Sequence, residues 1–428
     1  MRLLIVFFGI VCLLVARFSG ENWRTPAALY TTIWVAFCIL PSCFLWTDAD
    51  WYYSGLLWIE ISCLFFSVGQ AFGSADKWKV SVRELKTEYY GVKRFSLNIE
   101  LCRTILIVMF VICVIHIVRS LVTRGFSLSV FYNLESLIDV NNSSAYARYH
   151  GDNSATILNQ LFLIVEYCLP LVGGFALSFY KKKPEKILCG LSVLPVFVSF
   201  FLSNAKAGFI ASMIGFVVTY MIGSYIANGK EKRFSPKFIR NAIILAVAFF
   251  AVLFISMCLR VGDFSPSTID YVRKRFMVYM FGQMKAFDEW FTVGRRGYEM
   301  TFGTMTYNWF FNLTGLVERQ QGVYGYAQSL RTNVFTMFRG IITDFGTIGG
   351  IAYCLIRGVV AWYIVKHIHK KTIVNALLIT LLATTYLFFI YGFIISPWTY
   401  TTYFAAYFIF FIILFICRSK GELLNEII

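Results

Sequence analysis

The chain has 428 residues, of which 58% are hydrophobic and only 14% are charged. This composition excludes an ordinary soluble protein of the same size, in which about a quarter of the residues are charged. The net charge is +16, but many of the lysines lie in short stretches between apolar runs, where membrane topology explains them without a nucleic-acid partner.

Apolar runs long enough to cross a bilayer as helices, about 17–25 residues each, occupy most of the chain. They predict an all-α fold, a polytopic helical integral membrane protein with about eleven transmembrane helices. The stretch after Met1 resembles a signal peptide, but no small-residue cleavage site follows it, so we expect an uncleaved first span. The predicted spans are 3–19, 27–46, 52–72, 104–122, 157–180, 187–203, 207–226, 241–259, 347–365, 373–393 and 402–417.

The predicted spans divide the chain into three parts. Residues 1–259 hold the first eight helices, residues 260–346 form one long loop before the ninth helix, and residues 347–428 hold the last three. Lysine-rich loops at 73–103 and 227–240 indicate the cytoplasmic side, which places the long loop in the periplasm. With eleven spans the N-terminus is then outside. A missed span or a re-entrant hairpin is the alternative.

The long loop is rich in arginine, which the topology rule does not require there. Between Arg260 and Asp344 it carries eight arginines and two lysines. The planar guanidinium binds phosphate oxygens in a bidentate manner, which predicts a site for an anionic head group. The alternative is that these arginines reach lipid phosphates at helix ends. Lys206 lies in a very short external turn, where a lysine defies the topology rule.

The stretch from Ser329 to Gly350 contains Thr332-Asn-Val-Phe-Thr336, then Arg339, then Asp344-Phe-Gly-x-x-Gly349. These elements, in this order and before a membrane span, resemble the O-antigen polymerase (Wzy) family, and the resemblance extends more loosely from Ser203 to Arg357. A second stretch, Arg273 to Asp288, is similar to the family's Tyr-x-x-Gly-x-x-x-Ala-Phe segment and is predicted to be an amphipathic helix on the outer surface.

The resemblance implies a metal-independent glycosyltransferase that joins oligosaccharide repeat units on undecaprenyl pyrophosphate into a long polysaccharide, as in lipopolysaccharide or capsule biosynthesis. It implies a multi-pass protein of the bacterial inner membrane with the active site facing the periplasm. The expected partners are the lipid-linked donor and acceptor, membrane lipids and a chain-length regulator. No cofactor and no nucleic acid are expected. The alternatives are an O-antigen ligase and a non-enzymatic flippase or transporter of the same lipids.

Candidate site residues follow from the same resemblance. The pyrophosphate would be held by four cations, and the candidate catalytic residues are Asn333, Thr336 and Asp344. The ligase relatives carry His-Asn where this chain has Thr332-Asn333, which favours a polymerase and leaves the general base unidentified. Asp344 is either that base or the N-cap of a helix that begins near Phe345. The four cations are Lys206, Arg260, Arg331 and Arg339.

No metal site is expected. The pattern Asp48-Ala-Asp50 has the form by which many glycosyltransferases hold a metal-bound sugar nucleotide, but it lies in a loop of only a few residues. Two carboxylates in a short solvated turn are the favoured interpretation.

Overall fold

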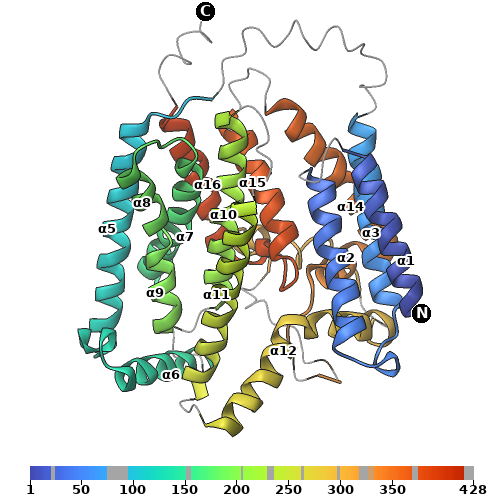
Figure 1. Cartoon of the computed structure of the whole chain (residues 1–428), viewed down its shortest axis with the longest axis horizontal. Coiled ribbons are helices and arrows are strands. Elements are labelled where there is room, and N and C mark those ends of the chain that lie inside the picture. Colours follow the sequence, from blue (N-terminus) through green and yellow to red (C-terminus); the bar gives the residue numbers. More distant parts are fainter. Residues whose placement is uncertain are drawn as a thin grey trace, which may run out of the picture. The chain divides into compact units, whose positions relative to one another are not determined.

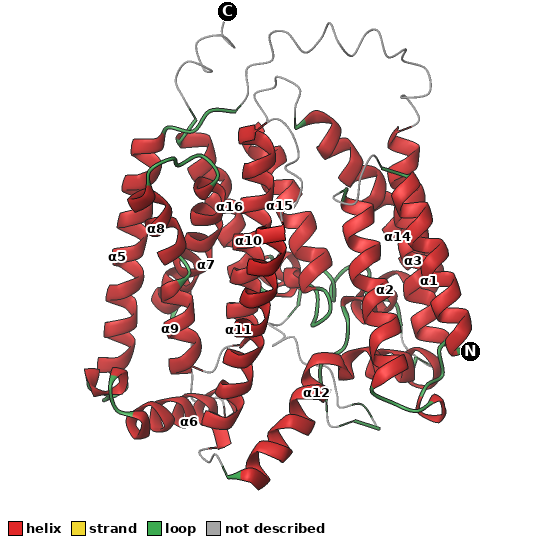
Figure 2. Ribbon diagram, viewed as in Figure 1, coloured by secondary structure: helices red, strands yellow, loops and turns green. Residues whose placement is uncertain are grey.

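The computed structural model describes residues 1–20, 25–74, 95–150, 156–203, 206–228, 236–261, 265–295, 299–317, 327, 329–330, 332–368 and 375–418. Within these ranges every regular element is a helix (Figures 1 and 2). Seven of the described helices are long and apolar enough to cross a membrane, and three shorter apolar helices accompany them. The predicted fold class, a polytopic helical membrane protein, is confirmed.

The chain forms two compact units, and each takes segments from both halves of the sequence. Unit 1 consists of Met1–Lys93 and Met277–Thr401, and unit 2 consists of Arg94–Phe276 and Thr402–Ile428. The helices of unit 1 are α1 (Arg2–Phe18), α2 (Pro26–Phe44), η1 (Asp48–Asp50), α3 (Ser54–Ser74), η4 (Trp290–Gly294), α13 (Asn308–Leu313), α14 (Met337–His367), α15 (Asn375–Tyr391) and η5 (Pro397–Thr399). Helix α12 (Pro266–Glu289) begins in unit 2 and ends in unit 1.

Unit 2 contains the remaining helices. They are α5 (Ile99–Thr123), η3 (Leu128–Phe131), α6 (Leu134–His150), α7 (Ile157–Leu177), α8 (Lys183–Leu191), α9 (Leu194–Ser203), α10 (Lys206–Asn228), α11 (Pro236–Val261) and α16 (Thr401–Ile416). Helices therefore cover all eleven predicted spans, although the span predicted at 187–203 is divided between α8 and α9. How many of them cross the membrane stays a prediction.

Local signals explain where several helices begin. The Thr25 hydroxyl accepts a hydrogen bond from the Ala28 N–H, and Pro26 occupies the first position of α2. The Asn98 side chain caps α5 in the same way by accepting from the Leu101 N–H, at 3.1 Å. Each cap satisfies an N–H group that the helix itself leaves without a partner.

Glycines allow the closest helix contacts in both units. In unit 1 a Cβ at Gly358 of α14 would lie 2.1 Å from the Phe66 carbonyl oxygen of α3, and one at Gly69 of α3 would lie 2.1 Å from the Leu355 carbonyl oxygen. In unit 2 a Cβ at Gly174 of α7 would lie 2.2 Å from the Phe216 carbonyl oxygen of α10. Small residues of this kind let two helix backbones approach each other inside a membrane.

One predicted helix boundary is wrong. We expected a helix to begin near Phe345, with Asp344 as either its N-cap or the general base, but α14 begins at Met337. Its helical geometry is interrupted at Gly346, where φ is 73°. Glycine is favoured there because a side chain is strained at positive φ. The helical segment after this kink starts where the predicted span 347–365 starts.

We predict that Gly358→Ala separates α3 from α14 and destabilises the protein by about 1–3 kcal/mol, the usual cost of overpacking. The measurement is the thermal unfolding midpoint of the purified protein in detergent. Gly190→Ala is the matched control, because a Cβ at Gly190 meets no atom within 4 Å. Equal midpoints for the two variants would contradict the contact.

Candidate functional site

The candidate site lies at the start of α14, which carries the motif residues. The Met337 N–H donates to the Gly392 carbonyl at 2.7 Å, so the connection between α15 and η5 caps this end of the helix. Every side chain from Met337 to Asp344 is buried. Phe338 fixes the segment, because its ring lies 4.5 Å from that of Trp34 and 5.5 Å from that of Trp58.

Arg339 is the buried cation of this segment, with only 8% of its surface exposed. Its guanidinium carbon lies 4.1 Å from the centre of the Phe335 ring and 5.3 Å from that of Trp290. Aromatic faces attract a guanidinium and hold its plane, while its N–H groups point outward in that plane. This geometry orients an arginine for bidentate binding of an oxyanion.

Asp344 is fully buried and binds the segment that precedes α13. One carboxylate oxygen accepts from the Thr301 hydroxyl at 2.5 Å and from the Met305 N–H at 3.0 Å, and the other accepts from the Thr306 N–H at 2.7 Å. The carboxylate therefore holds residues 301–306 against α14. The Asp344 carboxylate binds residues 301–306 and not an N–H group of the helical segment after Gly346, so the N-cap interpretation is wrong. Its role as a base stays a prediction.

Three buried hydroxyl groups belong to this segment and to two segments that hydrogen bonds connect near it. Thr306, Thr336 and Thr399 are at most 7% exposed, and each has a hydroxyl oxygen with no hydrogen-bond partner. All three belong to segments joined at the 392–400 connection, because Ser396 donates to the Thr306 carbonyl at 2.7 Å and Met337 donates to Gly392. Unsatisfied buried hydroxyls are suited to a hydroxyl-rich ligand or to water.

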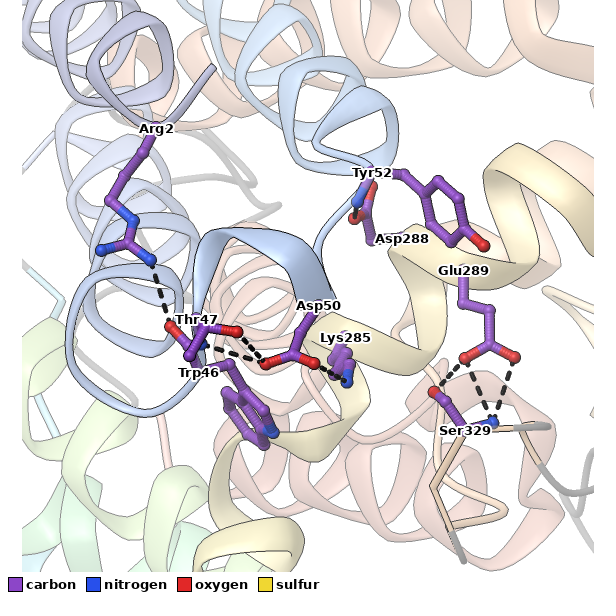
Figure 3. Close-up of polar contacts among 9 residues, drawn as sticks. All are labelled: Arg2, Trp46, Thr47, Asp50, Tyr52, Lys285, Asp288, Glu289 and Ser329. Carbon is purple, nitrogen blue, oxygen red and sulfur yellow. Dashed lines mark hydrogen bonds and ion pairs between the residues drawn. The ribbon is translucent and has the colours of Figure 1, made fainter.

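The C-terminal half of α12 supplies a polar anchor that sequence reasoning missed (Figure 3). The Asp288 carboxylate accepts from the backbone N–H groups of Tyr52, Tyr53 and Gly55, at 2.8, 2.9 and 2.8 Å. It thereby caps the start of α3, where an acid also complements the helix dipole. Burial raises the pKa of Asp288, and these backbone hydrogen bonds act in the opposite direction.

Two neighbours of Asp288 bind other segments at the same end of unit 1. Glu289 accepts from the Ser329 N–H at 3.3 Å and also from its hydroxyl, which ties the start of the motif stretch to α12. Lys285 lies 3.9 Å from the Asp50 carboxylate. The sequence signal for this anchor was the pair of acids, Asp288 and Glu289, at the end of the predicted amphipathic helix.

The candidate metal-binding pattern, Asp48-Ala-Asp50, lies in a short turn between α2 and α3. Asp50 is exposed and accepts from the Thr47 hydroxyl at 2.7 Å and from the Thr47 N–H at 3.0 Å. The hydroxyl contact lowers the pKa of Asp50. The Asp48 side chain lies outside the described residues. Among the residues that the structure describes, no group of three His, Cys, Asp or Glu side chains could hold a metal ion.

The predicted cations divide between the units. In unit 2, Lys206 at the start of α10 is half-buried, and Arg260 near the end of α11 is close enough to repel it electrostatically. Arg339 belongs to unit 1, and Arg331 lies outside the described residues. Asn333 is half-buried in the extended segment before α14. The structure thus brings Lys206 and Arg260 together.

In comparisons with known proteins, no family model, no curated protein and no solved structure matches this chain. The family resemblance therefore depends on the motif residues alone.

We predict that Asp344→Ala releases residues 301–306 from α14. The change leaves two backbone N–H groups and one hydroxyl without their acceptor. Each of these groups that stays buried should lower the free energy of unfolding by about 1–3 kcal/mol. Hydrogen exchange should accelerate at the Met305 and Thr306 amides. Asp270→Ala is the control, since Asp270 is an exposed acid paired with Arg273 and Lys274. Unchanged exchange in the Asp344 variant would refute the anchoring role.

Proposed function

We propose that this protein is a polymerase of lipid-linked oligosaccharides at the outer face of a bacterial cytoplasmic membrane. Its substrates are undecaprenyl-pyrophosphate-linked repeat units, and its product is a long polysaccharide. The observation that carries the proposal is Arg339, a buried guanidinium held between Phe335 and Trp290 at the start of the motif-bearing helix.

The reaction needs a cation at the leaving group. The hydroxyl oxygen of the acceptor sugar attacks the anomeric carbon of the donor, the bond from this carbon to pyrophosphate breaks, and the acceptor proton passes to a base. Pyrophosphate gains negative charge in the transition state, so a fixed guanidinium lowers the barrier. Lys206, Arg260 and Arg331 are the further candidates for this role. Asn333 and Thr336 are candidates for orienting the acceptor, and Asp344 for accepting its proton.

A flippase or transporter of the same lipids is the second candidate, and one observation favours it. His116 of α5 and Glu166 of α7 lie 3.7 Å apart within predicted spans, and both are buried. Buried ionisable pairs of this kind occur in proton-coupled transporters. Loss of a polymerase leaves single repeat units outside the membrane, whereas loss of a flippase leaves them inside. A ligase differs from a polymerase in the acceptor that it uses.

We predict that Arg339→Ala shortens the chains that purified protein makes from lipid-linked repeat units. Losing one charge-assisted contact to the leaving group should slow transfer about 30- to 1000-fold, equivalent to about 2–4 kcal/mol. Arg339→Lys should recover little of this rate, because an ammonium lacks the planar fork.

Arg295→Ala is the matched control for this comparison. Arg295 also stacks on an aromatic ring, that of Phe291 at 4.6 Å, but it is exposed. The three variants are compared at equal amounts of folded protein. If both Arg339 variants made chains of wild-type length, Arg339 would not be part of the pyrophosphate site.

The orientation of the motif stretch is tested separately. A cysteine at Ser329 should react with a membrane-impermeant maleimide in intact spheroplasts, because Ser329 is exposed and predicted to be periplasmic. Among the native cysteines, all of which the structure describes, only Cys43 is not buried, so Cys43→Ser provides the background protein. If the Ser329→Cys variant reacted only after lysis, position 329 would lie on the cytoplasmic side.

A further inference from the structure

Glu60 is an acidic residue inside a predicted membrane span. It lies in α3, six residues after the helix begins at Ser54, which corresponds to about 9 Å along the axis. The residue has no exposed surface, and neither carboxylate oxygen has a hydrogen-bond partner. Asp288 and Asp344 are equally buried, but their oxygens accept hydrogen bonds from backbone N–H groups, whereas those of Glu60 do not.

Among the residues that the structure describes, no basic side chain forms an ion pair with Glu60, and the nearest acid capping α3 is Asp288, which binds Gly55 five residues earlier. One carboxylate oxygen faces α1, since a Cβ on Gly9 would lie 2.9 Å from it. The buried thiols of Cys12, Cys38 and Cys63, on α1, α2 and α3, interact electrostatically with Glu60. The sequences of these helices contain no other acid and only two cations, Arg2 and Arg17 at the ends of α1.

Two cations of unit 1, Arg2 and Arg357, lie at other levels than Glu60. Arg2 donates to the Trp46 carbonyl at 3.1 Å, and Gly9 is seven residues further along α1, about 10 Å away. Arg357 of α14 neighbours Gly358, which contacts α3 at Phe66, about 9 Å along the axis from Glu60. Arg357 instead lies 5.2 Å from the Phe388 ring.

An ionised carboxylate in this place would be a buried charge without a counter-charge. Removing a carboxylate from water without a partner costs several kcal/mol, which is comparable to the whole stability of many domains. A bound proton removes the charge and leaves only the smaller cost of burying a neutral polar group. We infer that Glu60 is a proton-binding site within the membrane-spanning part of unit 1 and that the folded protein holds it as a neutral carboxylic acid at neutral pH. This inference does not depend on the polymerase proposal.

Infrared spectroscopy of the full chain in lipid vesicles at neutral pH tests the inference. The difference spectrum between wild type and Glu60→Gln should contain the C=O stretch of a protonated carboxyl group, shifted in heavy water, and this band should be absent from the variant. The variant should unfold at or above the wild-type temperature, because an amide replaces a neutral acid of the same shape. The paired bands of an ionised carboxylate in the difference spectrum would overturn the inference.

A second measurement uses only the wild-type protein. Dicyclohexylcarbodiimide enters membranes and adds to protonated carboxyl groups, taking up the acid proton on nitrogen and forming a stable acylurea after rearrangement. Mass spectrometry should find the intact reagent mass on the peptide that contains Glu60 and not on that of the exposed Glu100. Modification of Glu100 but not of Glu60 would count against a neutral, membrane-accessible acid at this position.

Discussion

The contact between α3 and α14 is the constraint on which the rest of unit 1 depends. Gly69 and Gly358 bring the two backbones together at one level, and Trp58 of α3 donates to the Thr347 carbonyl of α14 at another, at 3.2 Å. Because α3 and α14 are held together at both levels, the Phe338 ring packs against Trp34 of α2 and Trp58 of α3. The position of Arg339, the next residue, follows from that packing.

The acidic and basic side chains at the end of α12 and the start of α14 have different roles. Asp288, Glu289 and Asp344 each accept hydrogen bonds from backbone N–H groups of segments far away in the sequence. They hold α3, the motif stretch and residues 301–306 in place. The oriented cation, Arg339, is supported by aromatic rings. Hydrogen bonds from these acids therefore hold the segments around Arg339, the guanidinium that we propose for the leaving group.

The polymerase proposal and the Glu60 inference concern different residues of unit 1. Arg339 lies in the first turn of α14, before the kink at Gly346, whereas Glu60 lies inside the span of α3. Stabilising a leaving pyrophosphate requires a positive charge at the membrane surface. Holding a neutral acid requires an apolar environment without cations.

The sequence alone determined the fold class and the positions of the apolar segments, because the hydrophobic length of a helix is a local property of the chain. It also indicated Arg339, whose stacking partner Phe335 is only four residues away, and the glycine at position 346. Tertiary structure decided where α14 begins, since the acceptor of the Met337 N–H is the carbonyl of Gly392. It likewise decided the roles of Asp344 and Asp288, whose partners lie 38 and 235 residues away. A carboxylate has no preferred distant partner in the sequence, and only the packing of helices brings a particular backbone N–H within hydrogen-bonding distance.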